Sequence, residues 1–157
     1  MRLPLILAVS LAFGQPVLGA PAADAADPVA RWEEDPTMWF DAAEVELADF
    51  LWTARPVVVF ADSPADPAFE RQVELFRAEA DDLDRRDVVV ITDADPSADT
   101  AIRRKLRPRG FMMVLLGKDG GVKLRKPLPW HVRELGRVID KMPMRQQEMR
   151  DRRDVGE

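Results

Sequence analysis

The hydrophobic pattern in the middle of the chain predicts a buried strand followed by a long helix. Val57 to Phe60 is an unbroken run of β-branched and aromatic residues, which is typical of a strand covered on both faces. After a polar loop, Asp66 is suited to cap a helix and Pro67 to open it, since proline has no N–H to leave unpaired. The apolar residues that follow lie on one helical face, at Phe69, Val73, Phe76, Ala80 and Leu83.

Two further apolar runs complete a predicted sheet. Val88 to Ile91 follows a helix-length crossover, so this strand should lie parallel to the first. Phe111 to Leu116 leads into a tight turn at Asp119 and Gly120 and then the alternating segment 122–125, which indicates an antiparallel hairpin. Lysine and arginine alternate along this last strand, as expected at a sheet edge.

Three more helices are predicted around these strands. Asp41 can cap the first, whose apolar positions are Leu47, Phe50, Leu51 and Ala54, and it must end before Pro56. Polar residues 93–97 open a short helix that ends at Leu106. A closing helix runs from Trp130 to Met142, where Pro143 breaks it.

The predicted order is helix, strand, helix, strand, helix, hairpin and helix. This is an α/β, thioredoxin-like plan with a mixed sheet of order 2-1-3-4, helices on both faces and an extra N-terminal helix. A flavodoxin-like sheet is the alternative, but the turn at 118–121 is too short to hold the helix it requires. We expect a signal peptide at 1–22, a linker at 23–40, one domain at 41–143 and a polar C-terminal tail at 144–157.

The first residues resemble a secretory signal peptide. Arg2 precedes a short apolar stretch, and small residues around Ala20 and Ala22 match a cleavage site. The apolar stretch is too short to span a bilayer of ~30 Å, so a membrane anchor is the less favoured interpretation. A lipoprotein is excluded because the chain has no cysteine to carry the lipid. We therefore expect a periplasmic or secreted protein that is stabilised without disulfides and has no membrane span after signal removal.

Charge is distributed unevenly over a chain whose formal net charge is −5. Residues 23–100 contain 6 basic and 21 acidic residues, whereas residues 101–157 contain 16 basic and 7 acidic ones. The two halves can attract each other within one fold, or the basic half can present a face to a polyanion.

Four segments resemble a known family. They are RPVVVF at 55–60, RRDVVVI at 85–91, LLGKDGGVKLR at 115–125 and IDKMPMRQQEM at 139–149. Together they are similar to the bacterial branch, called P-DUDES, of the DUDES domain family, a domain of unknown function, over about 46–150. The resemblance implies a thioredoxin-like, peroxiredoxin-related fold and no established activity.

The peroxiredoxin-like plan indicates where a pocket should lie. Proteins of that plan carry a reactive cysteine at the start of the helix after the central strand, and an arginine that lowers its pKa. Here Ser63, Ala65 or Asp66 stands at the first position and Arg109 at the second, so the candidate binding pocket is Asp62, Ser63, Asp66 and Arg109. Arg109 can also simply pair with Asp62 or Asp66. Serine cannot replace a thiol in peroxide reduction, so we expect no thiol-dependent redox activity and name no catalytic residue.

Other chemical signals are weak. His131 is the only histidine, and a catalytic dyad would have to use a serine such as Ser63. The acidic stretch from Asp93 to Asp99 imitates a calcium loop but lacks its glycine and its closing glutamate. Methionines could suggest copper, but Met112 and its neighbour 113 point to opposite faces of one strand. We expect no cofactor and no metal.

Met144, Arg145 and Met149 form a candidate docking segment. An arginine flanked by methionines combines a bidentate cation with adaptable apolar surface, although the same residues could merely cover the edge of the core. The favoured hypothesis is a non-catalytic binding module in the cell envelope, whose partner is an envelope protein or an anionic envelope component. The alternatives are an enzyme that uses the pocket without cysteine and a metal-binding envelope protein, and nothing indicates nucleic-acid binding.

Overall fold

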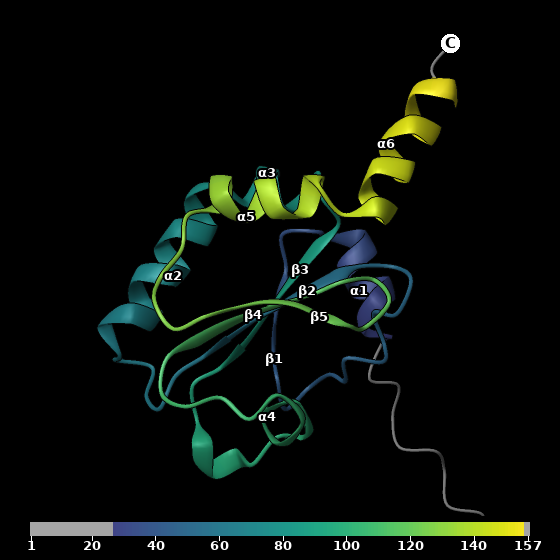
Figure 1. Cartoon of the computed structure of the whole chain (residues 1–157). Coiled ribbons are helices and arrows are strands. Elements are labelled where there is room, and N and C mark those ends of the chain that lie inside the picture. Colours follow the sequence, from purple (N-terminus) through teal and green to yellow (C-terminus); the bar gives the residue numbers. More distant parts are fainter. Residues whose placement is uncertain (1–26, 156–157) are drawn as a thin grey trace, which may run out of the picture.

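The computed structural model describes residues 27–155 (Figure 1). The predicted signal peptide at 1–22 lies outside the described residues, as do the first residues of the predicted linker. The elements in chain order are α1 (Pro28–Glu34), β1 (Trp39–Asp41), β2 (Arg55–Phe60), α2 (Pro67–Ala78), α3 (Ala80–Asp84), β3 (Val88–Asp93), a 3₁₀ turn (Pro96–Ala98), α4 (Ala101–Leu106), β4 (Met112–Leu116), β5 (Val122–Lys126), α5 (Val132–Asp140) and α6 (Pro143–Val155). No helix in this part of the chain is long and apolar enough to cross a membrane.

The sheet has the order β1-β3-β2-β4-β5. Strands β1, β3 and β2 are parallel, and β4 and β5 are antiparallel to their neighbours. At the centre, Val57 lies opposite Val90 on one side and Leu115 on the other. The predicted order 2-1-3-4 is confirmed for the four main strands, and β1 adds a short edge strand made of the last two residues of the predicted linker and Asp41. The fold is thioredoxin-like.

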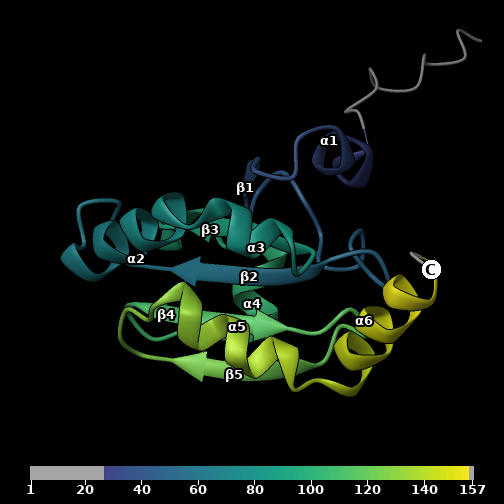
Figure 2. The ribbon, with the colours of Figure 1, turned by 90° about the horizontal axis from the view of Figure 1, so that it is seen from above.

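Alternate residues of the central strand enter two separate cores. Val57 and Val59 pack beneath α2, α3 and α5 with residues such as Phe76 and Leu135, whereas Val58 and Phe60 face the side covered by α4. Figure 2 shows α2 and α3 over one half of the sheet, α5 over the other half and α6 beyond its end. All six residues of β2 are buried, which explains why polar and apolar residues do not alternate along 57–60.

The predicted helix at 41–54 does not form. Asp41 instead ends β1, and its carboxylate accepts a hydrogen bond from the Ala43 N–H at 2.8 Å. Asp49 turns the chain in the same way by accepting from the Glu46 N–H at 2.8 Å. Aspartate side chains that bond nearby N–H groups favour turns over helix. The segment therefore forms successive turns, which still bury Ala42, Val45, Leu47, Phe50 and Ala54.

The N-terminal helix of the described chain lies earlier than predicted. It is α1, which Asp27 caps by accepting from the Val29 N–H at 3.0 Å and which Pro28 opens. Trp32 of α1 is buried in the core on the α4 side.

Most residues of the predicted polar C-terminal tail form a helix, α6. Helix α5 already ends at Asp140, before the predicted end at Met142, and Pro143 is the first residue of α6, a position that suits a residue without an N–H. Helix α6 extends away from the body of the domain (Figure 1). Its buried residue is Arg145, in the first turn.

Candidate functional site

The residues of the predicted pocket lie at the carboxyl end of β2. The side chains of Asp62 and Ser63 are exposed. The Ser63 Oγ accepts a hydrogen bond from the Ala65 N–H at 3.2 Å, and Asp66 caps α2 by accepting from the Ala68 N–H at 2.8 Å. These contacts shape the loop and the start of the helix, and none of them activates the serine.

A different arginine from the predicted one organises this end of the sheet. Arg109 is exposed, and within residues 27–155 it forms no ion pair with Asp62 or Asp66, so the expected pairing is not formed. Arg103 of α4 instead pairs with the buried Asp93 at 2.7 Å and donates to the carbonyl oxygen of Ala61 at 2.9 Å. We did not predict this role of Arg103 from the sequence. The signal that the sequence offers is Asp93, a carboxylate at the end of a buried strand that needs a nearby cation.

The acidic residues after β3 have separate structural roles. Asp93 accepts a hydrogen bond from the Thr100 hydroxyl at 2.7 Å. Asp95 caps the 3₁₀ turn, and the hydrogen bonds from the Ser97 hydroxyl and N–H lower the pKa of its carboxyl group. Asp99 pairs with Arg104. Over the described residues, no three histidine, aspartate or glutamate side chains are grouped as metal ligands.

The opposite end of the sheet holds a group of interconnected charges. Arg55, the first residue of β2, is only 1% exposed. Its guanidinium donates to the carbonyl oxygen of Arg86 at 2.9 Å and to the carboxylate of Glu148 at 2.8 Å. Lys118 of the β4–β5 hairpin pairs with Asp87 at 2.9 Å and with Glu148 at 3.1 Å. Three strand ends and α6 are therefore joined by buried or half-buried ion pairs.

Helix α6 contributes two cations to the same group. Arg145 is 7% exposed, donates to the carbonyl oxygen of Arg85 at 2.7 Å and lies 3.3 Å from the Glu148 carboxylate. Arg152 lies 3.3 Å from Asp87. We call these six residues the charged network: Arg55, Asp87, Lys118, Arg145, Glu148 and Arg152.

The network favours the ionised form of Glu148. Burial alone would raise the pKa of Glu148, but the hydrogen bonds from Arg55 and Lys118 and the positive charges of these two residues outweigh it, so the pKa is lowered. Beside the network, Asp140 holds Arg86 through two hydrogen bonds of 2.8 and 3.0 Å, which raises the pKa of Arg86. Four cations surround the two carboxylates of the network, and Asp140 adds a third carboxylate 3.7 Å from Arg145, so positive charge is still in excess.

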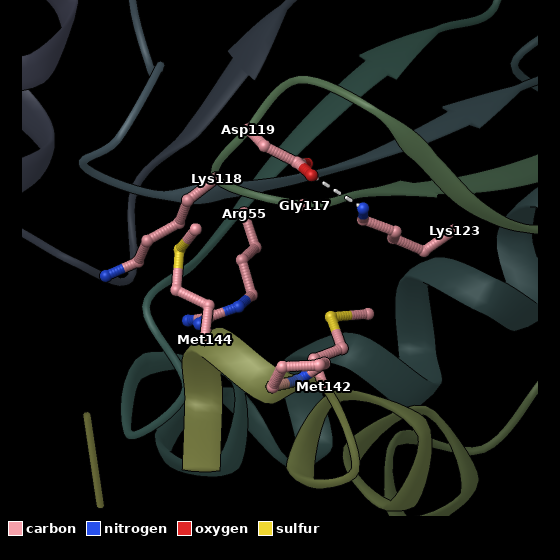
Figure 3. Close-up of a pocket in the computed structure, with 8 residues that line it drawn as sticks. Arg55, Gly117, Lys118, Asp119, Lys123, Met142 and Met144 are labelled. Atoms are coloured by element: carbon pink, nitrogen blue, oxygen red, sulfur yellow. Dashed lines mark hydrogen bonds and ion pairs between the residues drawn. The ribbon is translucent and has the colours of Figure 1, made fainter. Parts of the chain in front are cut away.

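A pocket of about 260 Å³ lies next to the network, between the β4–β5 hairpin and the junction of α5 and α6 (Figure 3). Its lining residues are Arg55, Gly117, Lys118, Asp119, Lys123, Met142, Pro143 and Met144. Figure 3 shows the two methionines approaching from the helix side and Lys123 from the hairpin, where its ammonium pairs with Asp119 at 2.7 Å. The pocket thus combines thioether surface with basic groups.

The three residues of the predicted docking segment do not form one surface. Met144 lines the pocket and is 36% exposed, Met149 is half-buried, and Arg145 is turned inward as an intramolecular clamp. Sequence reasoning missed Lys118, Lys123 and Met142. The available signal was the set of four family-like segments, because each of them supplies at least one residue of the charged network.

Comparisons with known proteins give a family and two similar folds. A family model described as Domain of unknown function (DUF4174) matches residues 46–148. The structure of the mitochondrial 2-cys peroxiredoxin from Plasmodium falciparum is 15% identical, with a TM-score of 0.46 over 61% of this chain and 79% of that one. The reduced desulfothioredoxin from Desulfovibrio vulgaris Hildenborough is 21% identical, with a TM-score of 0.43 over 66% of this chain and 97% of that one.

Proposed function

The chain belongs to the DUF4174 family, and from that premise we propose that it is an exported, non-catalytic binding module of the cell envelope. It has a thioredoxin-like fold and no cysteine, so the thiol chemistry associated with such folds is not available to it. Export is inferred from the signal-like sequence at residues 1–22.

One observation carries the binding role: the family-like segments meet at the pocket end of the sheet rather than at the end where thioredoxin-like chemistry is expected. Arg55 and Lys118 belong both to the charged network and to the pocket wall. The network holds the hairpin, the strand ends and α6 in fixed relative positions. A rigid frame around an open pocket favours recognition, because little order has to be created on binding.

The contacts at the opposite end of the sheet favour binding over catalysis. A serine nucleophile needs a base within hydrogen-bonding distance, whereas among the described residues the Ser63 hydroxyl oxygen accepts a hydrogen bond from the backbone N–H of Ala65 in its own loop. The buried acid at that end, Asp93, is already held by Arg103 and Thr100. An ion pair satisfied in this way stabilises the fold and offers no free acid or base to a substrate.

Capture of a partner from an envelope fraction tests this proposal. The mature chain is immobilised, and its capture is compared with that of Met144→Asp, which places a charge at the pocket mouth. Because residue 144 is exposed and lies in the first turn of α6, an aspartate there should not destabilise the helix. Lys105→Glu, an exposed change on α4, is the control.

We expect a component that the parent and the Lys105→Glu variant capture and the Met144→Asp variant does not. Capture of the same components by all three would contradict a role for the pocket. No specific capture from the protein's own envelope would contradict the binding function itself.

A further inference from the structure

Resting on the proposed function, we propose that the pocket accepts an apolar side chain from a partner protein, with an acidic residue of the same partner segment bound at the rim. Met142 and Met144 would contact the apolar side chain, and Lys123 would pair with the acid.

The size of the pocket favours a side chain over a free small molecule. Its volume of about 260 Å³ is below the range of roughly 300–1,000 Å³ typical of small-molecule sites. Methionine side chains are flexible and polarizable, so they adapt to different apolar shapes and are frequent at binding surfaces. An inserted side chain of moderate size would therefore have apolar contact with the two methionines on the helix side of the pocket.

Charge at the rim specifies an acidic neighbour. Lys123 is 34% exposed and its present partner, Asp119, is 40% exposed, so this is a surface pair that contributes little to stability. A carboxylate from a partner can replace Asp119 or share its lysine. Lys118 and the network behind it carry excess positive charge, since four cations surround two carboxylates. A lysine-rich segment would be repelled at the same place.

The buried network keeps the pocket walls in place before any partner arrives. Glu148 joins Arg55 and Lys118, which both line the pocket, and Arg145 fixes the first turn of α6 directly after Met144. The side chain would therefore enter a preformed pocket, as in recognition modes that use one anchor residue and a charged rim.

The experiment uses the mature chain with its methionine methyl groups labelled with ¹³C. The probes are three capped peptides: Asp-Asp-Leu-Asp-Asp, Lys-Lys-Leu-Lys-Lys and Asp-Asp-Ser-Asp-Asp. Met142 and Met144 report on the pocket, while Met113 of β4, whose side chain is fully buried in the core between the sheet and its covering helices, is the internal control. We expect the first peptide to shift the signals of the two pocket methionines at millimolar concentration and to leave Met113 unchanged. The other two peptides should bind more weakly.

A pair of variants separates the rim charge from general electrostatics. Lys123→Glu should weaken the binding of the acidic leucine peptide by about threefold to fivefold, the effect expected for an exposed charge pair. Lys105→Glu changes the net charge equally but lies on α4, so binding should be unchanged. Equal binding of all three peptides, an equal loss in both variants, or no shift at Met142 and Met144 would each overturn the inference.

The failure of this inference can be distinguished from the failure of the binding function. If a captured envelope partner is lost in Met144→Asp but is not displaced by the acidic leucine peptide, the pocket binds another chemistry and only the inference is wrong. If the peptide binds as described but the mature chain captures nothing from the envelope, the inference about the pocket stands and the proposed envelope role is wrong.

Discussion

Replacing Glu148 by glutamine should destabilise the protein more than any ordinary surface substitution. Glu148 accepts hydrogen bonds from Arg55 at 2.8 Å and pairs with Lys118 at 3.1 Å, and Arg145 lies 3.3 Å away. Glutamine keeps the volume and can still accept a hydrogen bond, but it carries no charge. Asp87 would then be the one remaining carboxylate of the network, beside four cations.

The expected loss is about 2–3 kcal/mol. Hydrogen bonds to charged groups are worth about 1.5–3 kcal/mol each, and breaking a buried ion pair costs about 3–5 kcal/mol. We take a value below that range because the Glu148 side chain is 19% exposed and Asp87 still neutralises part of the charge. For a domain of this size the loss corresponds to a fall in Tm of roughly 6–15 °C.

Denaturant unfolding of the protein at neutral pH measures the effect. Glu134→Gln is the matched control, because Glu134 is 47% exposed and pairs with Arg137 on the surface of α5, so its loss should stay within about 0.5 kcal/mol. A Glu148→Gln variant as stable as this control, or more stable than the parent, would show that the desolvation of Glu148 costs as much as its ion pairs contribute.

The same carboxyl group predicts a dependence on pH. Its pKa is lowered in the folded protein, so its stabilisation is complete above the unfolded pKa of ~4.3 and is lost as the pH falls through the folded pKa. The stability difference between the parent and Glu148→Gln should therefore shrink in acid. A difference that stays constant down to strongly acidic pH would contradict this reasoning.

Three further predictions concern other parts of the chain. Arg145→Ala should lower stability by about 2–4 kcal/mol, because it removes a buried clamp on the Arg85 carbonyl; a melting temperature equal to that of the parent would show that no clamp exists. The mature chain should begin between Ala22 and Ala26, and mass spectrometry showing an intact Met1 in a membrane fraction would contradict export. Peroxide consumption with a thioredoxin or glutathione donor should equal that of a heat-killed control, because the chain has no cysteine.

The strands could be predicted because a short, continuous run of β-branched and other apolar residues is compatible with few structures besides a buried strand. Val57 to Phe60 is buried on both faces, and a helix-length crossover to Val88 leaves only a parallel arrangement. The segment 42–54 was wrongly predicted as a helix because its apolar spacing fits a helix by chance. The hydrogen bonds of Asp41 and Asp49 to nearby N–H groups instead favour turns. The spacing of apolar residues carries no information about such bonds, so it cannot distinguish turns from a helix here.

The site could be predicted only in part. Met144 and Arg145 were singled out by composition and resemblance, but nothing local indicated that the arginine would be buried. Arg55 precedes a proline at the start of a strand and resembles an ordinary surface residue, while its partner Glu148 lies 93 residues away. Which arginine pairs with which acid depends on tertiary geometry, as the choice of Arg103 over Arg109 also shows.

The bond between Arg55 and Glu148 has a consequence for the order of folding. Contacts between distant residues form late, because the intervening chain must first lose its loop entropy. During synthesis the central strand becomes available long before α6, and until α6 docks the guanidinium of Arg55 lacks the carboxylate of Glu148. The C-terminal helix should therefore act as the final step of folding, and a fragment that ends at residue 143 should populate an incompletely closed intermediate rather than the native domain.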